Sequence, residues 1–290
     1  MSREARYRCN GIDLAVTVDG EGPAVLLVHG FPDSGAVWRK QVPALVAAGY
    51  RVIVPDLRGC GESDAPRQTR AYRIEALSAD LAALLDALGV AKVKLVAHDW
   101  GAVIGWNFCM NYPDRVERYV ALSVGHPNAY ARGGWEQKRK GWYVLFLQLR
   151  GLAEWGLRRN DWRLLRRLTG WHDEAPHWIA LLGRPGRLTA AINYYRANIA
   201  MFLRSDWPSV RVPVCGVWSS KDAYLAEVQM LQSRHFVAAP WRYDRIEGVG
   251  HWLQLDAPER VNALLIAQLA SPLPAWGDAA QPAVPAGAPA

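Results

Sequence analysis

Long hydrophobic runs and closely spaced cysteines are both missing from this sequence. No apolar stretch reaches the roughly 18–20 residues that a membrane-spanning helix needs. The four cysteines are far apart and form no C-x-x-C pair, so neither a disulfide framework nor a zinc site is expected. The first residues show no apolar segment of the kind found in secretory signals. These absences predict a cytoplasmic protein that uses no metal.

Charge and polarity are also too low for a disordered chain. Of the 290 residues, 51% are hydrophobic and 21% are charged, with a formal net charge of +7. This composition is typical of a packed globular protein and excludes collagen-like and coiled-coil chains. The length suits one large domain, or one domain that carries an insertion.

Short aliphatic runs alternate with helical patterns along most of the chain. The runs are too short for helices and rich in β-branched residues, which predicts strands buried on both faces. They occupy residues 24–28, 51–55, 93–97, 119–123 and 212–217. Between them, segments such as 74–88 place apolar residues three and four apart, as amphipathic helices do. The alternation predicts an α/β fold, with a mostly parallel sheet flanked by helices.

The alternation stops between residues 129 and 205, which predicts an inserted all-helical cap. This stretch holds 14 Lys/Arg against 5 Asp/Glu, a local excess of +9 that leaves the rest of the chain at −2. Residues 1–128 and 206–270 would then form the core, and the proline-rich tail at 271–290 is expected to be disordered. The basic helices either present solvated faces or meet an anionic membrane or partner. No pattern of a nucleic-acid-binding module appears.

The segment around Asp99 carries the most chemical information. A predicted strand runs into Asp99 between the small residues Ala97 and Gly101, and a helical segment follows. This is the context of a nucleophile elbow, a tight turn that raises one side chain above the sheet edge. The elbow usually holds serine, whereas a carboxylate suits displacement at saturated carbon and leaves an ester that must be hydrolysed. The simpler alternative is that Asp99 only caps the helix.

An acid and a histidine follow Asp99 in the order that this kind of active site requires. Asp222 comes 123 residues later, shortly after a predicted strand, and His251 follows by a further 29 residues in a glycine-bracketed loop. Loops at the carboxyl ends of parallel strands meet at one edge of the sheet. His251, oriented by Asp222, is therefore expected to act as general base for water. Each residue taken singly could be an ordinary loop residue.

A fourth element is the tetrapeptide His29-Gly30-Phe31-Pro32, directly after the first predicted buried strand. The backbone N–H groups of Phe31 and Trp100 are expected to form an oxyanion hole at the base of the site. The charge that this hole would stabilise appears on the Asp99 carboxyl when water attacks the ester. The His29 side chain is expected to be structural.

Together these motifs resemble those of the α/β-hydrolase-fold epoxide hydrolases. The resemblance covers about residues 8–268 and includes two cap segments, 142–148 and 193–196. These segments are similar to the family's two ring-opening tyrosine motifs, and the matching residues are Tyr143 and Tyr195. The sequence departs from the family pattern at a few positions near the site, namely Ala97, Arg150, Ser219 and Ala223.

The resemblance implies that Asp99 attacks an epoxide carbon while Tyr143 and Tyr195 assist the departing oxygen. An alkoxide is a poor leaving group, so hydrogen bonds or protons from two phenols would help it leave. His251 would then activate water to hydrolyse the ester and release a vicinal diol. Taken without the resemblance, both tyrosines could be ordinary core aromatics.

The expected substrate is a small apolar epoxide, with water as co-substrate and no cofactor. The residues expected to line its pocket are Phe31, Trp100, Phe146 and Trp252. Neither a nucleic-acid partner nor a transmembrane span is expected, and a homodimer is left open.

Three alternatives remain beside the epoxide hydrolase. A haloalkane dehalogenase would use the same Asp/His/Asp triad with two N–H donors for the halide; Phe31 argues against one donor arrangement, whereas the cap tryptophans leave another open. A fluoroacetate-type dehalogenase fits less well, because Trp100 stands where that family has an arginine. A non-catalytic binding protein is the third alternative, since fold alone does not determine function. A serine esterase is excluded, because no Gly-x-Ser-x-Gly elbow exists.

Overall fold

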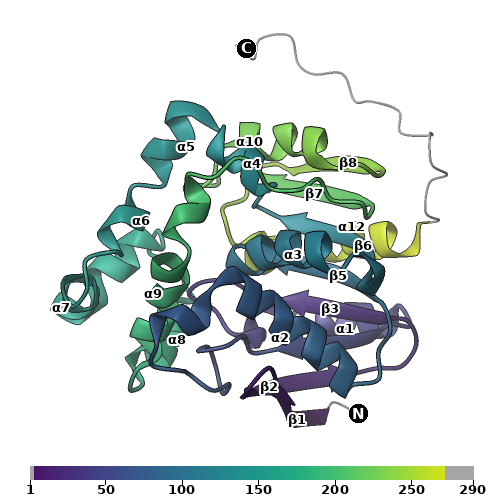
Figure 1. The fold of residues 1–290 in the computed structure, drawn as a ribbon, viewed down its shortest axis with the longest axis horizontal. Helices are drawn as coiled ribbons and strands as arrows, with labels where there is room; N and C mark the ends of the chain where they lie inside the picture. Colours follow the sequence, from purple (N-terminus) through teal and green to yellow (C-terminus); the bar gives the residue numbers. More distant parts are fainter. Residues whose placement is uncertain (1–2, 272–290) are drawn as a thin grey trace.

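The computed structural model describes residues 3–271, and its centre is one eight-stranded sheet (Figure 1). The strand order is β1-β2-β4-β3-β5-β6-β7-β8. The strands are β1 (Arg3–Cys9), β2 (Ile12–Asp19), β3 (Ala24–Val28), β4 (Arg51–Pro55), β5 (Val93–His98), β6 (Val116–Leu122), β7 (Val214–Ser219) and β8 (Trp241–Ile246). Strands β3 to β8 pair in parallel, whereas β2 is antiparallel to both β1 and β4. The predicted α/β fold with a mostly parallel sheet is confirmed. The expected tail at 271–290 lies outside the described residues except for Ser271.

Strand β3 shows why the parallel strands are aliphatic throughout. Leu26 and Val28 pack into one core, and Val25 and Leu27 pack into another on the opposite face of the sheet. Successive side chains of a strand point to opposite faces, so a strand covered on both sides needs apolar residues at every position. Each fully buried aliphatic side chain stabilises the fold by about 1.5–3 kcal/mol relative to an exposed one.

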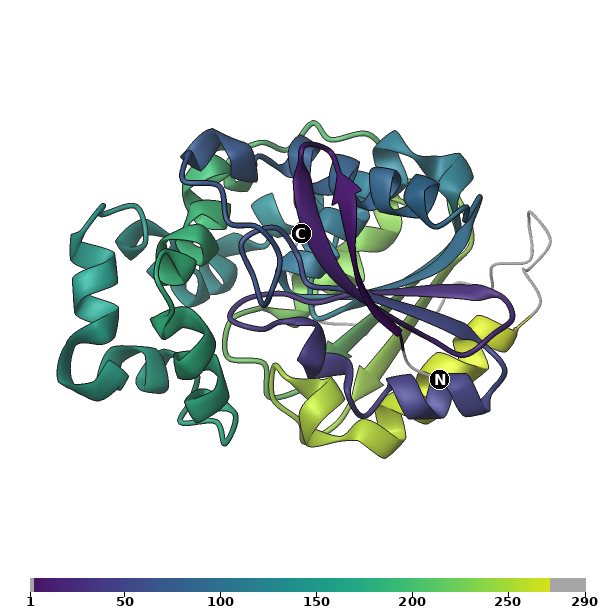
Figure 2. The ribbon, with the colours of Figure 1, turned by 90° about the horizontal axis from the view of Figure 1, so that it is seen from below.

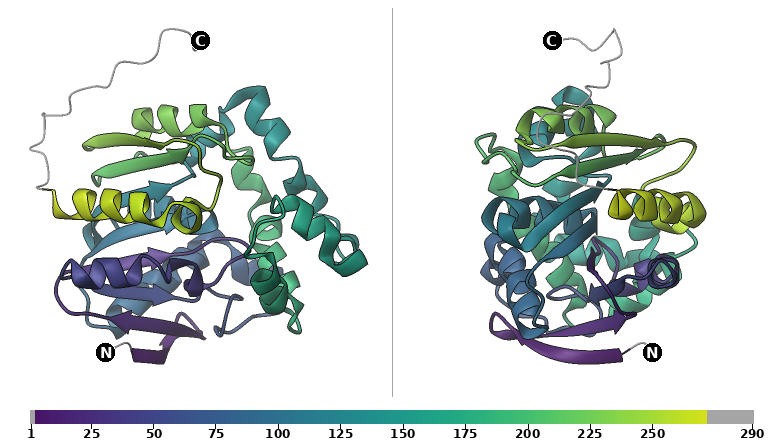
Figure 3. Two further views of the ribbon diagram at one scale, coloured as in Figure 1. Left: turned by 180° about the vertical axis from the view of Figure 1, so that it is seen from behind. Right: turned by 90° about the vertical axis from the view of Figure 1, so that its right-hand side faces the viewer.

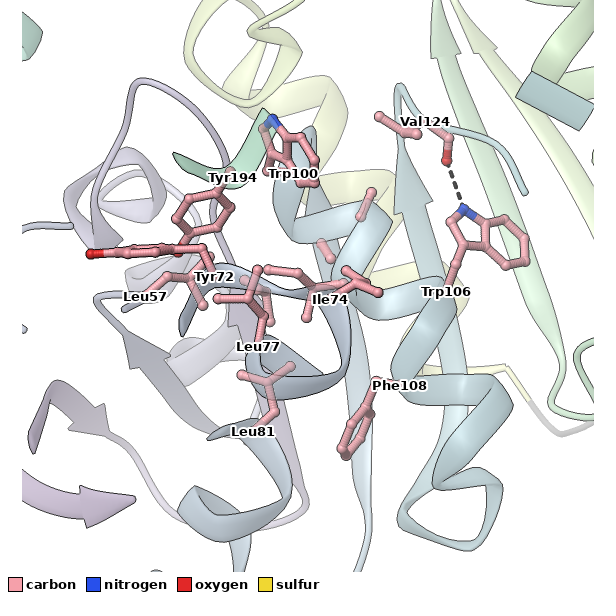
Figure 4. Packing of buried hydrophobic residues seen from close by; sticks show 14 of the residues in the cluster. Leu57, Tyr72, Ile74, Leu77, Leu81, Trp100, Trp106, Phe108, Val124 and Tyr194 are labelled. Atoms are coloured by element: carbon pink, nitrogen blue, oxygen red, sulfur yellow. Dashed lines mark hydrogen bonds between the residues drawn. The ribbon is translucent and has the colours of Figure 1, made fainter. Parts of the chain in front are cut away.

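Helices cover both faces of the sheet, as the end-on view shows (Figure 3). On one face lie α2 (Ile74–Ala87) and α3 (Trp100–Asn111), and on the other lie α1 (Val42–Ala47) and α12 (Pro258–Ala270). In the core between α2 and α3, Leu77 and Leu81 lie near Phe108 (Figure 4). On the other side of α3, the Trp106 indole donates to the Val124 carbonyl at 2.9 Å. The shorter helices are η1 (Gly35–Trp38), η2 (Thr69–Tyr72), η3 (Pro113–Arg115), α10 (Glu227–Gln232), η5 (Ser233–Phe236) and α11 (Leu253–Asp256).

A group of helices follows β6 and precedes β7, in the region where the sequence predicts a cap. They are α4 (Pro127–Ala131), α5 (Gly134–Lys140), α6 (Tyr143–Phe146), α7 (Leu152–Leu168), α8 (Ala175–Gly183), α9 (Arg187–Ala197) and η4 (Ile199–Phe202). Helix α7 is interrupted by four non-helical residues, 159–162. Helices α5 to α9 gather at one end of the sheet (Figures 1 and 2). Helices α6 and α7 lie farthest from it (Figure 1). We call α4 to α9 the cap helices.

Polar contacts tie the cap helices to the core on two sides. On one side Lys140 donates to the carbonyl oxygens of Asp222 and Leu225 at 2.8 and 2.9 Å. On the other, His172 lies 2.9 Å from Asp256. These contacts restrict where the cap side chains can sit above the sheet edge. No helix within residues 3–271 combines the length and hydrophobicity needed to cross a bilayer.

Candidate active site

Asp99 occupies a strained turn between β5 and α3. Its backbone has φ 51° and ψ −124°, which are unusual for a residue with a side chain. The turn needs close neighbours without side chains: a Cβ on Gly101 would lie 2.3 Å from the Val28 carbonyl oxygen. A Cβ on Gly30 would lie 2.3 Å from the Asp99 carboxylate itself. The geometry is that of a nucleophile elbow holding a carboxylate.

Backbone N–H groups point at the Asp99 carboxylate from both sides of the turn. The Phe31 N–H donates to Asp99 Oδ1 at 2.7 Å. A hydrogen bond from the Trp100 N–H also lowers the pKa of Asp99 and so favours its charged form. Burial alone would raise the pKa of Asp99, but the nearby His251 outweighs it, and the pKa is lowered. The carboxylate therefore stays ionised, with an oxygen already in the predicted oxyanion hole.

His251 lies between two carboxylates. Its Nδ1 is 2.7 Å from Asp222 Oδ2, and its Nε2 is 3.4 Å from Asp99 Oδ2. The second oxygen of Asp222 accepts the backbone N–H groups of Tyr224 and Leu225 at 2.8 and 3.0 Å, which fixes that buried side chain. Burial opposes a charge on the imidazole, but Asp222 and Asp99 prevail and raise the pKa of His251 to about 10. The unreacted site thus holds an imidazolium between two anions.

Tyr143 and Tyr195 belong to two cap helices and line the same cavities as Asp99. Tyr143 begins α6 and Tyr195 lies in α9, and their ring centroids are 5.9 Å apart. The Tyr195 ring also contacts Trp100 and Phe31 edge-on, at 5.0 and 5.6 Å. Burial raises the pKa of both phenols well above the ordinary value, so both remain protonated hydrogen-bond donors.

Two apolar cavities meet at Asp99, Tyr143 and Tyr195, the three residues that line both. The first, which we call the leucine cavity, encloses about 480 Å³ including open solvent, and its apolar wall comes from Leu147, Leu157, Leu165 and Leu168. The second, the Trp100 cavity, encloses about 540 Å³, and its wall includes Trp100, Val103, Met201 and Phe202. A substrate at Asp99 can therefore extend in two directions.

Three of the four predicted lining residues reach these cavities. Phe31 and Trp252 line the leucine cavity, and Trp100 lines the cavity named after it. Phe146 differs from the prediction, because it lines neither of them. Tyr143 begins the short helix α6, and Leu147 directly follows that helix, four residues later. Both face the leucine cavity, whereas Phe146 points toward Gly156 of α7. Leu147 thus occupies the wall position that the sequence analysis assigned to Phe146.

Tyr224 is a site residue that the sequence analysis missed. Its ring lies 4.9 Å from the His251 ring and 6.0 Å from the Tyr143 ring, and it lines the leucine cavity. Its hydroxyl donates to the carbonyl of Leu168 in the cap. The one signal in the sequence is its place two residues after Asp222.

Asp33 was missed as well, although it directly follows the His-Gly-Phe-Pro motif. Its carboxylate accepts the indole N–H groups of Trp178, at 2.5 Å, and Trp252, at 3.1 Å. Burial raises the pKa of Asp33 to about 7, against the lowering effect of the two indoles. It thus links a cap helix to the loop that carries His251.

Two further histidines, His29 and His98, contact backbone groups through their ring nitrogens. His29 accepts the Leu57 N–H at 3.0 Å on Nε2, and its Nδ1 lies 2.9 Å from the Gly30 carbonyl. His98 Nε2 lies 2.9 Å from the carbonyl oxygen of His251. Burial lowers the pKa of both rings, so both stay neutral. The expectation of a structural His29 agrees with these contacts.

A carboxylate at the elbow of such a sheet, paired with a histidine and a second acid, is an arrangement typical of α/β hydrolases. The family model for the alpha/beta hydrolase fold matches residues 23–258. Human epoxide hydrolase 4 is 32% identical over 90% of this chain and 76% of its own length. Epoxide hydrolase A of Mycobacterium tuberculosis is 33% identical over 89% of this chain and 94% of its own. The chain therefore belongs to the α/β-hydrolase-fold epoxide hydrolases.

A comparison with a solved structure supports the same family. Epoxide hydrolase A from Mycobacterium thermoresistibile aligns with a TM-score of 0.82 at 31% sequence identity. The alignment covers 93% of this chain and 98% of the other. The similarity thus extends over the sheet and the cap helices together.

Proposed function

We propose that this protein hydrolyses apolar epoxides to vicinal diols through an ester on Asp99. The observation that carries the proposal is the placement of one carboxylate between two kinds of proton donor. Asp99 faces the imidazolium of His251 on the core side and lines both cavities together with the phenols of Tyr143 and Tyr195. Ring opening needs a nucleophile and an acid at the same place, and this arrangement supplies both.

In the first half-reaction, an oxygen of Asp99 attacks one epoxide carbon. A C–O ester bond forms as the ring C–O bond breaks, and the released electron pair stays on the former ring oxygen. That oxygen takes a proton from Tyr143 or Tyr195. The resulting phenolate receives the proton of the His251 imidazolium, which leaves His251 neutral.

The loss of the Asp99 charge makes His251 a usable base. Two carboxylates raise its pKa in the unreacted site, and esterification removes the charge of one of them. Neutral His251, held by Asp222, can then take a proton from water as the water attacks the ester carbonyl. The oxyanion that forms lies at the N–H groups of Phe31 and Trp100.

The ester then breaks at its acyl C–O bond. The leaving alkoxide takes the proton from His251 and departs as the diol. The regenerated carboxylic acid of Asp99 returns a proton to His251. The carboxylate and the imidazolium are thereby restored, and the net reaction is epoxide plus water to diol.

The two cavities favour epoxides with an apolar group on each ring carbon. The three residues common to both cavities are Asp99 and the two phenols, so the ring would sit at the junction with one substituent on either side. Both walls are mainly aliphatic and aromatic, which suits hydrocarbon or aryl groups.

Intact-protein mass spectrometry of the His251→Gln variant tests the covalent step. After rapid mixing with trans-stilbene oxide, this variant should gain the full mass of the epoxide, because the ester forms but water is not activated. The Asp99→Ala variant should gain nothing under the same conditions. A His251→Gln protein that stays unmodified, while the unaltered protein still makes diol, would remove Asp99 as nucleophile.

The same experiment with a bromoalkane separates the haloalkane dehalogenase alternative. An epoxide adduct without a bromoalkane adduct supports the epoxide hydrolase, and the reverse supports the dehalogenase.

We also place the reaction in the cytoplasm, because all four cysteines are free thiols, as is usual in a reducing compartment.

A further inference from the structure

Most of the exposed large apolar side chains of the described chain belong to one segment of the cap. Eight such side chains occur in residues 3–271, and seven of them fall between residues 135 and 171. Exposure reaches 79% for Trp135 and 70% for Leu145. We define the cap outer face by these seven residues, which are Trp135, Trp142, Leu145, Leu149, Leu152, Trp155 and Trp171. So many exposed tryptophans and leucines in one segment are typical of an interaction site.

Part of the cap outer face lies on α6 and α7, the helices that wall the leucine cavity. On α6, Tyr143 faces the cavity while Leu145 is exposed. On α7, Leu157 faces the cavity while Trp155 is exposed. Helices α6 and α7 lie farthest from the sheet (Figure 1). A single helical layer therefore separates this face from the site.

Basic residues alternate with the apolar ones along the same segment. Residues 135–171 contain nine Lys/Arg and three Asp/Glu, a net charge of +6. One of the three acids, Glu154, is paired with Arg196 of α9 and does not neutralise the outside. Arg139, Arg163 and Arg167 are exposed and form no ion pair in the part of the chain that the structure describes.

Tryptophan and arginine also pair directly on this face. The Arg159 guanidinium lies 4.8 Å from the centre of the Trp155 ring. An aromatic ring with a polar edge beside a cation is suited to the boundary between water and lipid, where tryptophan is enriched. Leucines and tryptophans supply the apolar part of such a contact, and arginines attract anionic headgroups.

We propose that the cap outer face binds the surface of an anionic phospholipid membrane. A second copy of this chain fits less well, because a symmetric contact would bring a segment with a net charge of +6 against another of the same sign. An anionic bilayer offers both the opposite charge and an apolar layer for the exposed tryptophans and leucines. One consequence rests on the proposed function: apolar epoxides dissolved in a bilayer would be close to the cavity.

Sedimentation with sucrose-loaded vesicles tests the binding without any assay of activity. The full 290-residue chain is mixed with vesicles of phosphatidylcholine alone, or with vesicles in which one third of the lipid is phosphatidylglycerol. We expect binding to the anionic vesicles to be about tenfold tighter, since each arginine near the surface adds to the attraction. Raising the salt concentration should reverse most of this gain.

Matched variants separate the cap outer face from the general positive charge of the protein. The triple variant Arg139→Glu/Arg163→Glu/Arg167→Glu should lose most of the binding to anionic vesicles. The control Lys92→Glu/Arg211→Glu/Arg242→Glu changes the net charge by the same amount at exposed positions outside the cap, and should retain the binding to anionic vesicles. Trp135→Ser/Leu145→Ser/Trp155→Ser tests the apolar part, with Leu203→Ser, 85% exposed and outside the face, as its control.

Thermal melting of each variant by circular dichroism shows whether it folds. The proposal is overturned if the two charge-reversal variants bind equally, or if the chain binds neutral and anionic vesicles alike. It is also overturned if size-exclusion chromatography with light scattering shows a dimer that the cap variants dissociate, because a second copy would then cover this face.

Discussion

The Nε2 atom of His251 lies 3.4 Å from Asp99 Oδ2, while Asp222 holds the opposite nitrogen of the ring at 2.7 Å. The imidazole is therefore a shared partner of the proposed nucleophile and of its own orienting acid. This relationship couples the charge of Asp99 to the pKa of His251. It also explains how one histidine can be an acid before the ester forms and a base afterwards.

Neutralising Asp99 should lower the pKa of His251. The Asp99→Asn variant keeps the shape of the side chain but removes one of the two anions that raise this pKa to about 10. Titration of the His251 ring signals by NMR measures the change. The exposed Asp206→Asn variant is the control and should leave the titration unchanged. An unaltered pKa in Asp99→Asn would mean that Asp222 alone sets the charge of His251.

The charge on His251 should also make stability depend on pH in a defined direction. The pKa is about 10 in the folded protein and 6.5 for an ordinary histidine, so the folded state binds the proton more tightly. The resulting stabilisation is fully present below pH 6.5, falls as the pH rises, and is lost above about pH 10. The difference in free energy of unfolding between the unaltered protein and His251→Gln, measured in urea, should shrink over this range. A constant difference would contradict the assignment.

The parts of the fold that the sequence predicts are those where one physical requirement dominates. Strand β3 is aliphatic at every position because both its faces are buried, and it was predicted with its observed bounds. The hairpin of β1 and β2 was missed, although Ile12, Leu14 and Val16 alternate with more exposed residues and an Asn-Gly turn precedes them. Strand β8 was missed because it is an edge strand rich in charged residues.

The site residues also fall into two groups, those that the sequence predicts and those that it does not. Asp99, Asp222 and His251 each follow a strand, and the shared edge of a parallel sheet brings such positions together. Tyr224 and the cavity leucines act through packing between cap and core, which depends on how α6 and α7 lie above the sheet. Phe146 and Leu147 are adjacent in sequence at the end of α6, and only the direction in which the backbone turns there decides which of them faces the cavity.

Removing both phenols should block epoxide opening while the protein stays folded. The Tyr143→Phe and Tyr195→Phe variants should each slow adduct formation about a hundredfold, because each removes one proton donor from the departing oxygen. The double variant should form no adduct with an epoxide, although Asp99 and His251 remain in place. Stopped-flow mixing followed by mass spectrometry in the His251→Gln background measures the rate. Normal adduct formation in the double variant would leave the phenols without a chemical role.

The elbow should tolerate no side chain at Gly30. A Cβ there would lie 2.3 Å from Asp99 Oδ1 and 2.7 Å from the Trp100 nitrogen, so Gly30→Ala must displace the carboxylate or the turn. We expect a loss of diol formation and a destabilisation of about 1–3 kcal/mol. Gly183→Ala is the control, because its nearest neighbour would be 3.8 Å away. Thermal melting and product assays of both variants compare them directly, and equal behaviour would contradict the close approach.

Filling one cavity should change which epoxides react. Val103 lines only the Trp100 cavity and Leu168 lines only the leucine cavity, so phenylalanine at either position occupies the space of one substituent. Trans-stilbene oxide carries a ring on each epoxide carbon and needs both cavities, whereas styrene oxide carries one ring and can use the cavity that stays open. Val103→Phe and Leu168→Phe should therefore each lower kcat/KM for trans-stilbene oxide by about tenfold or more relative to styrene oxide. Val103→Ala enlarges the Trp100 cavity and should not lower kcat/KM for trans-stilbene oxide relative to styrene oxide. If both substrates lose activity equally in both phenylalanine variants, the two cavities do not hold separate substituents and the substrate lies elsewhere.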